Sequence, residues 1–148
     1  MVVGTESSAK AIYLGGNVKY TASNNAQFIH SNGRGRNLIS TGAGADTVVL
    51  YASGDDVSLG AGQDRVHLLS GSSNNKIDLG FDSFADQVYY YRPTLDQGLS
   101  TLLNFDPTFD SISLINLDST TSTTFSITAT KATPVSYTHL TLPTKRIV

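Results

Sequence analysis

The stretch Thr41–Leu68 reads TGAGADTVVLYASGDDVSLGAGQDRVHL and repeats an Asp-x-Val triplet at intervals of nine residues. The triplets begin at Asp46, Asp55 and Asp64. A short fixed period of this kind predicts a solenoid, in which each unit is one loop followed by one short strand. Because side chains alternate along a strand, the Val of each triplet points inward and its two neighbours point outward.

The same columns continue on both sides of this stretch, and the later units contain two extra residues each. The apolar column is Ile39, Val48, Val57, Val66, Ile77 and Val88; the polar column is Asn37, Asp46, Asp55, Asp64, Asn75 and Asp86; a third column is Leu50, Leu59, Leu68 and Leu79. Stacked units pool such residues into a thin continuous core, which no single unit forms alone. The sequence therefore predicts an all-β protein, a parallel β-solenoid with almost no helix.

Two of the loops share a pattern of glycine and aspartate. The pattern G-x-G-x-D occurs at Gly42, Gly44 and Asp46 and again at Gly60, Gly62 and Asp64. Glycine permits positive φ, and the missing Cβ lets backbone carbonyl groups converge. The aspartate adds a carboxylate to these oxygens, and Ca²⁺ takes roughly six to eight oxygen ligands.

These units resemble the G-G-x-G-x-D-x-U-x nonapeptide of RTX, or haemolysin-type, calcium-binding proteins. The resemblance implies a parallel β-roll with two units in each coil, so that loops on one side alternate along the sequence and Ca²⁺ lies between stacked loops. We therefore expect Ca²⁺ between loops 41–46 and 59–64. A second ion is expected between loops 59–64 and 79–86, where Asp82 or Asp86 would be a ligand.

The loops of the opposite side depart from the pattern. The first has Asn37 in place of Asp and carries positive charge on Arg34 and Arg36, the second keeps only Asp55, and the third ends in Asn75. We expect this side to bind Ca²⁺ weakly or not at all. A metal-free solenoid held by side-chain ladders is the alternative to the calcium-binding structure.

The repeats occupy residues 32–91. Residues 1–31 are interpreted as degenerate N-terminal β turns in which Ile12, Leu14 and Val18 point inward, and residues 92–134 as a C-terminal capping β segment. The sequence at 102–118, LLNFDPTFDSISLINLD, resembles the phrase that closes many RTX blocks. In that segment we expect Phe105 and Ile112 to fill the end of the core and Asp106 and Asp110 to organise turns, with Ca²⁺ ligation as the alternative role of Asp110.

Residues 135–148 are not used to infer the function. VSYTHLTLPT, which begins at Val135, resembles the translation of a sequencing adapter, so residues 135–148 are treated as a non-native tail. Without Lys145 and Arg146 the chain has 10 − 2 = 8 basic residues against 12 acidic ones, a net charge of −4.

Composition excludes several classes of function. The whole chain has a net charge of −2 and no basic stripe, which argues against nucleic-acid binding. It has no cysteine, so disulfides and thiolate metal sites are excluded. No run of about 18 apolar residues predicts a membrane span. No constellation of acids and bases repeats in register, so we expect no catalysis by this chain. The adjacent Asp55 and Asp56 are expected to diverge, and His67 to be a solvated outward residue.

We expect a calcium-binding β-roll module of a secreted bacterial protein that folds outside the cell when Ca²⁺ binds; type I export is implied by the resemblance alone. Two alternatives stay open: a metal-independent β-solenoid that serves as an adhesin or stalk, and the accessory end of a secreted hydrolase whose catalytic domain lies outside this chain. Cell-surface or polysaccharide contacts are candidate interactions. Tyr89, Tyr90 and Tyr91 are candidates for carbohydrate stacking, although strand alternation buries one or two of them.

Overall fold

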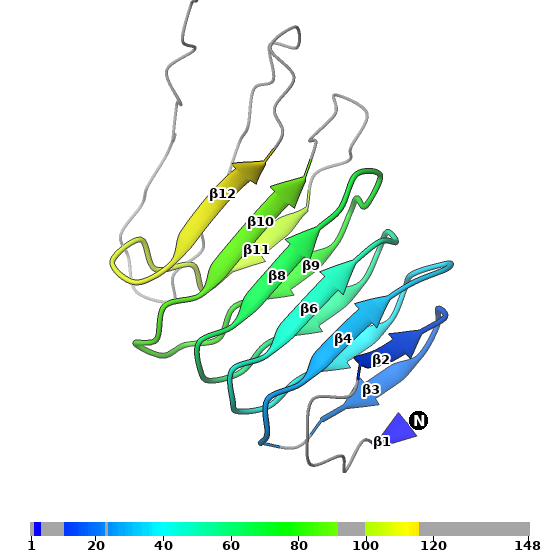
Figure 1. Cartoon of the computed structure of the whole chain (residues 1–148), viewed down its shortest axis with the longest axis horizontal. Coiled ribbons are helices and arrows are strands. Elements are labelled where there is room, and N and C mark those ends of the chain that lie inside the picture. The colour runs from blue at the N-terminus through cyan, green and yellow to red at the C-terminus, as the bar shows by residue number, and fades with distance from the viewer. Residues whose placement is uncertain (1, 4–10, 23, 92–99, 116–148) are drawn as a thin grey trace, which may run out of the picture.

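The computed structural model describes residues 2–3, 11–22, 24–91 and 100–115, and in these ranges the chain is a solenoid of parallel strands without a helix. Successive strands alternate between two facing sheets, so that each coil contributes one strand to each sheet (Figure 1). The predicted all-β, parallel β-solenoid architecture is confirmed. The absence of helix follows from short strands joined by glycine-rich loops, which leave no segment with helical periodicity.

The two sheets have six described strands each. The odd sheet has the order β1 (Val2–Val3), β3 (Lys19–Thr21), β5 (Leu38–Ser40), β7 (Asp56–Ser58), β9 (Lys76–Asp78) and β11 (Thr101–Leu103). The even sheet has the order β12 (Ser111–Ile115), β10 (Gln87–Tyr91), β8 (Arg65–Leu68), β6 (Thr47–Leu50), β4 (Phe28–Ser31) and β2 (Ala11–Leu14).

Equivalent residues of successive coils lie directly above one another. Val57 pairs with Ile39 on one side and with Ile77 on the other. In the even sheet Val66 pairs with Val48 and Val88 in the same way. This parallel register converts each column of the sequence into a row of contacting side chains along the solenoid axis.

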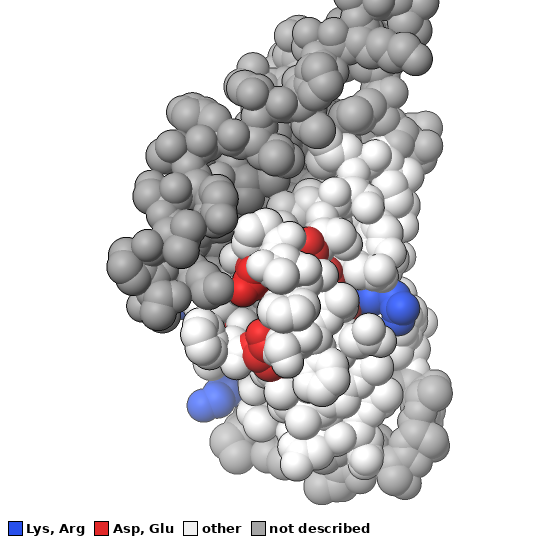
Figure 2. All heavy atoms as spheres, turned by 90° about the vertical axis from the view of Figure 1, so that its left-hand side faces the viewer, with Lys and Arg blue, Asp and Glu red and all other residues white. Residues whose placement is uncertain are grey.

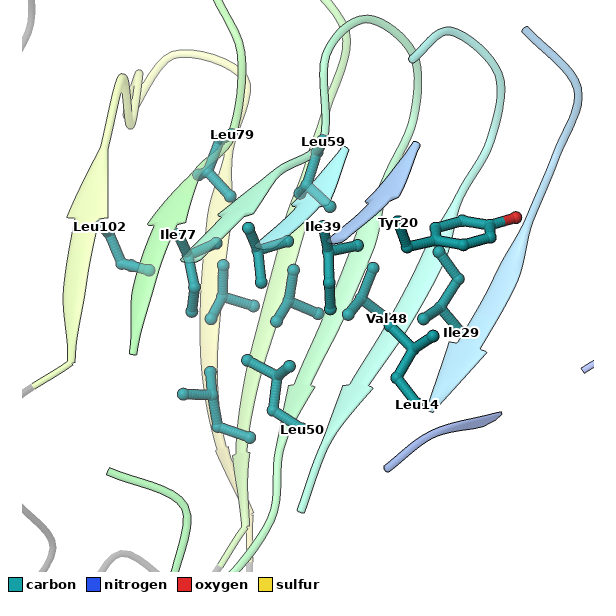
Figure 3. Packing of buried hydrophobic residues seen from close by; sticks show 14 residues of the cluster. Leu14, Tyr20, Ile29, Ile39, Val48, Leu50, Leu59, Ile77, Leu79 and Leu102 are labelled. Atoms are coloured by element: carbon teal, nitrogen blue, oxygen red, sulfur yellow. The ribbon is translucent and has the colours of Figure 1, made fainter. Parts of the chain in front are cut away.

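The core is the thin, continuous row that the columns predict (Figure 3). The central residues of the six repeat strands are all 0% exposed, and the Leu column is at most 1% exposed. Burying a side chain of this size stabilises a fold by about 1.5–3 kcal/mol, so pooled columns supply what no single coil has. Leu14, Tyr20 and Ile29 extend the core at the N-terminal end, and Ile12 and Val18 pack against it.

The described residues after β10 add one more coil to the same two sheets. β11 pairs with β9 and β12 pairs with β10, both in parallel. Leu102 is buried, and Phe105 and Ile112 pack against the core, as expected for residues that fill its end. The remainder of the expected cap, residues 116–134, and the tail 135–148 lie outside the described residues.

Candidate metal centre

One edge of the solenoid is formed by the loops that lead into the even sheet, and we call it the acid edge. Its loops 41–46, 59–64, 79–86 and 104–110 contain no Lys or Arg and carry Asp46, Asp64, Asp82, Asp86, Asp106 and Asp110. Figure 2, which faces the left-hand side of Figure 1, shows acidic side chains in the middle of this face and basic ones only at its margins. The sequence therefore concentrates negative charge along a single edge.

The two glycine-rich loops of this edge stack directly on each other. Ala43 forms a parallel bridge with Ala61. The backbone N–H of Ala61 donates to the Gly42 carbonyl at 2.9 Å, and the N–H of Gly44 donates to the Ala61 carbonyl at 2.9 Å. Loops 41–46 and 59–64 thus lie on the same side in adjacent coils, as a two-unit coil requires.

The motif glycines are needed because the stacked backbones approach closely. A Cβ on Gly60 would lie 1.8 Å from the Gly42 carbonyl oxygen, and one on Gly62 would lie 1.9 Å from that of Gly44. Both residues also have positive φ, 91° and 136°. Any larger residue would clash with the backbone of the preceding coil, so glycine here serves the contact between loops.

The aspartates form a ladder of side-chain to backbone hydrogen bonds. The Oδ1 of Asp64 accepts from the backbone N–H of Asp46 at 2.8 Å, and the Oδ1 of Asp86 accepts from the N–H of Asp64 at 2.9 Å. The ladder begins at Gln27, whose N–H donates to Asp46, and ends at Asp110, which accepts from Asp86 at 3.1 Å. Each carboxylate therefore satisfies a loop N–H of the coil before it.

The second oxygens of two of these carboxylates have no such partner. The Oδ2 atoms of Asp46 and Asp64 are buried and accept no hydrogen bond, and the two residues are 0% and 1% exposed. The Thr41 hydroxyl lies close enough to Asp46 to lower its pKa against the larger effect of burial, but it directs its single proton to the Leu59 carbonyl at 2.6 Å. A buried acceptor without a donor destabilises the fold, more so when it is charged. Asp46 and Asp64 therefore each present an oxygen that a proton or a cation would satisfy.

The acid edge favours protonated carboxyl groups when nothing else neutralises it. Burial raises the pKa of Asp64 to about 7, and the charges of Asp46 and Asp82 add to this, against the lowering effect of the Asp46 N–H. Burial likewise raises the pKa of Asp86 to about 7, with contributions from Asp64, Asp110 and Asp82. Burial also raises the pKa of Asp46 and of Asp110. Desolvation and mutual repulsion both disfavour the ionised column.

Asp82 and Asp110 extend this arrangement. The Oδ2 of Asp82 accepts from the Gly62 N–H at 2.9 Å and its Oδ1 from the Phe84 N–H at 2.8 Å, so this side chain lies against loop 59–64 but both of its oxygens already have donors. Asp110 is a member of the ladder, and it also accepts from the Asp106 N–H at 2.7 Å. The turn role expected for Asp110 is present, but its place in the column was missed. The signal was available, because Asp110 precedes Ile112 with the same Asp-x-apolar spacing as the repeats.

The opposite edge places Asp55 in a different environment. Its Oδ1 accepts from the N–H and the side-chain amide of Asn37, and its Oδ2 accepts from the Ser31 hydroxyl. Both oxygens are thus held by protein donors, unlike those of Asp46 and Asp64. Arg34 and Arg36, on the loop before Asn37, are exposed. Of the candidate ligands, Asp55 alone lies apart from the acid edge.

His67 and the three tyrosines 89–91, which the sequence also singled out, lie on the strands β8 and β10 of the even sheet. His67 points outward as expected, but it is half-buried and stacks on Tyr89 and Tyr91, with ring centroids 4.8 and 5.7 Å away. Burial and the charge of Arg65 lower the pKa of His67. Tyr90 packs inward, and burial raises its pKa to about 12. Strand alternation therefore separates the three tyrosines as predicted.

Side chains alone do not complete a metal site in the described part of the chain, where no three His, Cys, Asp or Glu residues gather around one point. An ion at the acid edge would need backbone carbonyl oxygens beside the carboxylates, which suits the oxygen preference of Ca²⁺ and no metal that requires thiolate or imidazole.

No protein-family model matches the chain, and neither a curated protein nor a solved structure matches it. Within the described ranges, no helix is long and apolar enough to cross a membrane. The function is therefore inferred from the geometry of the acid edge.

Proposed function

We propose that the chain is a calcium-binding β-roll module whose folded state is stabilised by Ca²⁺ at the acid edge. The observation that carries this proposal is the pair of buried Oδ2 atoms on Asp46 and Asp64, which lack donors in two stacked, glycine-rich loops. Oxygen ligands without competing protein donors are what a hard cation requires. The resemblance to RTX repeats supports the same assignment.

Calcium would act through the folding equilibrium. The carboxylates of Asp46, Asp64 and Asp86 repel one another when ionised, and a cation that binds only the stacked loops stabilises them by mass action. Asp46 and Asp64 would hold the first ion, with oxygens contributed by Gly42, Gly44, Gly60 and Gly62. Asp82 and Asp86 would serve the second. Secretion and folding outside the cell belong to this proposal, because extracellular calcium modules bind in about the 10⁻⁴–10⁻³ M range.

A metal-independent solenoid, acting as an adhesin or stalk, is the second candidate. The hydrogen-bond ladder favours it, because the Oδ1 atoms already join the coils without a cation. Protonated carboxyl groups with raised pKa values would remove the repulsion in the same positions. The two candidates differ in one property, the response of the fold to calcium near pH 7.5.

The deciding experiment is a calcium titration of the full chain at pH 7.5, in the urea concentration that half-unfolds each metal-free variant, followed by far-ultraviolet circular dichroism and reversed with EDTA. We expect a cooperative gain of β signal at or below millimolar Ca²⁺. The double variant Asp46→Asn with Asp64→Asn keeps the Oδ1 acceptors and removes the charged Oδ2 atoms, so its midpoint should rise at least about tenfold.

The matched control is Asp55→Asn on the opposite edge, which should leave the calcium midpoint unchanged. A chain that is equally β-rich in EDTA and in calcium, with the double variant indistinguishable from it, would replace the calcium proposal with the metal-independent solenoid.

A further inference from the structure

Exposed phenyl rings gather on the last two described loops of the acid edge. Phe81 and Phe84, on loop 79–86, are 68% and 53% exposed, and Phe109, on loop 104–110, is 43% exposed. Among the described residues, none of the three rings stacks on another aromatic ring. Exposed apolar groups gathered at one place mark an interaction surface more often than scattered ones do. We call these two loops and their rings the phenyl surface.

The two loops of the phenyl surface are joined at both ends. The side-chain amide of Asn104 donates to Asp78 Oδ1 at 2.7 Å, and the N–H of Asp86 donates to Asp110 Oδ1 at 3.1 Å. The rings are therefore presented by ordered loops, and binding through them loses little conformational entropy.

The phenyl surface places carboxylates beside its rings. Asp82 and Asp106 are partly exposed; the N–H of Phe84 donates to Asp82 Oδ1 at 2.8 Å, and that of Phe109 donates to the Asp106 carbonyl at 3.0 Å. A carboxylate has about four acceptor sites, so one that accepts backbone N–H groups keeps its charge and can accept further donors. A guanidinium group stacks on phenyl faces and also pairs with carboxylates. The surface therefore suits a partner that carries Arg or Lys next to an apolar side chain.

The opposite edge of the same chain carries side chains of this kind. Arg34 and Arg36 lie on the loop that leads into β5, and both are exposed. Leu38, the first residue of β5, is 45% exposed and pairs in register with Lys19 of β3, which is also exposed. These four residues, which we call the basic surface, combine three cations with an exposed aliphatic side chain.

The cations of the basic surface have no carboxylate partner in the described part of the chain. The one ion pair there joins Lys76 to Asp56 at 3.5 Å. Asp55, on the loop that stacks next to the two arginines, is buried, and its oxygens accept from Ser31 and Asn37. The three cations are therefore left to pair with a carboxylate of another molecule.

We propose that the phenyl surface of one copy of the chain binds the basic surface of a second copy. The two surfaces have opposite charge, and each offers apolar area next to its charged groups, so the contact pairs the charges and covers the rings. Because the surfaces lie on opposite edges of the solenoid, one partner cannot cover both. The contact is therefore heterologous, and copies join head to tail with one surface of each kind left open at the two ends. This contact does not depend on the proposed calcium function.

The test is sedimentation velocity of the full chain over a range of protein concentrations in millimolar Ca²⁺, in which the chain is folded under either candidate function. We expect the mean mass to rise with concentration at about 0.1 M salt. At about 1 M salt the screening length falls to about 3 Å, so the association should be lost.

Two variants each remove one surface. The first is Lys19→Glu with Arg34→Glu, and the second is Phe81→Ser with Phe84→Ser; each should raise the dissociation constant roughly tenfold or more. Mixed in equal amounts, the two should form a one-to-one dimer and nothing larger, because each supplies the surface that the other lacks. Tyr13→Ser, an exposed aromatic change on the outer face of the even sheet, is the control and should associate as the unchanged chain does.

The mixture gives the sharpest answer. A mixture that stays monomeric, or one that forms larger assemblies than a dimer, would overturn the head-to-tail contact. A chain that is monomeric at every concentration, or variants that associate as the unchanged chain does, would overturn it as well. Circular dichroism on the same samples shows that each variant is folded, and a variant that has lost its β signal is replaced by the single change Arg34→Gln or Phe84→Ser.

Discussion

The two edges of the solenoid use the same ladder with different chemistry. On both edges a side-chain oxygen accepts the backbone N–H of the equivalent position one coil earlier. The acid edge places carboxylates at successive positions, Asp46, Asp64, Asp86 and Asp110, whereas on the opposite edge Asp55 stands between the amides of Asn37 and Asn75. The fold thus needs only an acceptor at each position, and the second atom of each side chain decides what else the edge can bind.

That second atom has a different hydrogen-bonding role on the two edges. The amide nitrogen of Asn37 donates to Ser31 and Asp55, and the unpartnered buried atom on that edge is the Nδ2 of Asn75, which is a donor and repels cations. The unpartnered atoms of the acid edge are the Oδ2 of Asp46 and of Asp64, which are acceptors. Among the described residues, one edge leaves only a donor without a partner, and the other leaves acceptors that require a proton or a cation.

The largest expected change in stability comes from a substitution that tests how closely the loops of the acid edge stack. Gly60→Ala would place a Cβ 1.8 Å from the Gly42 carbonyl oxygen at a φ of 91°. We expect a loss of about 3 kcal/mol or more in the free energy of unfolding, from the clash and the backbone strain together. Urea denaturation in millimolar Ca²⁺ measures it.

Gly71→Ala on the opposite edge is the matched control. Gly71 has a φ of 90°, but an added Cβ there meets nothing within 4 Å. This variant should lose only about 1–2 kcal/mol, the cost of the left-handed conformation. Similar losses in the two variants would mean that φ alone, and not contact between the loops, makes the acid-edge glycine necessary.

The periodicity of the sequence was sufficient for the fold because parallel stacking repeats one environment in every coil. The columns that contain Val57 and Leu59 are buried as predicted, since an in-register solenoid offers them a single inward direction. The segment 102–118 follows the repeat less regularly. Its loop 104–110 is longer than the six-residue loops. Ser100 takes the acid position before β11 and accepts the N–H of Asn75.

The candidate site was only partly predictable. The spacing of Asp46 and Asp64 brought these residues together, and the glycines between them reported the close approach of their loops. Which carboxylate oxygens lack donors depends on residues from other coils, such as Ser31 beside Asp55. The motif glycines that precede Asp64 and are absent before Asp55 predicted that the two edges differ, but no local pattern shows which carboxylate oxygen lacks a donor.

The next effect in size is a pH dependence confined to the acid edge. In the folded chain the pKa values of Asp64 and Asp86 are raised from 3.8 to about 7, so the folded state binds protons more tightly than the unfolded state does. Their contribution to stability is fully present below about pH 4 and is lost as the pH rises towards 7. In EDTA, the free energy of unfolding should therefore decrease by at least about 1 kcal/mol when the pH is raised from 5 to 8, because one pKa unit corresponds to about 1.4 kcal/mol. The urea midpoint should decrease with it.

Calcium should reverse this trend, since it binds the ionised carboxylates and competes with protons. The double variant Asp64→Asn with Asp86→Asn keeps both Oδ1 acceptors and should flatten the profile in EDTA. A profile that rises from pH 5 to pH 8 in EDTA would contradict the assignment of protons to this column.

The smallest expected effect compares one carboxylate from each edge by the same substitution. At pH 7.5 in EDTA, Asp64→Asn removes a buried charge that faces Asp46 and Asp82, so the metal-free chain should gain about 1 kcal/mol in stability. Asp55→Asn replaces an Oδ2 that accepts the Ser31 hydroxyl with a donor, so it should lose about 1 kcal/mol. Urea denaturation of both variants beside the unchanged chain gives the two signs directly. Changes of opposite sign in the free energy of unfolding would mean that the ladder tolerates an amide at either edge. They would also mean that the carboxylates of the acid edge lower the stability of the metal-free chain. If both variants lose stability, the Oδ2 of Asp64 has a donor after all, and the chemical difference between the edges disappears.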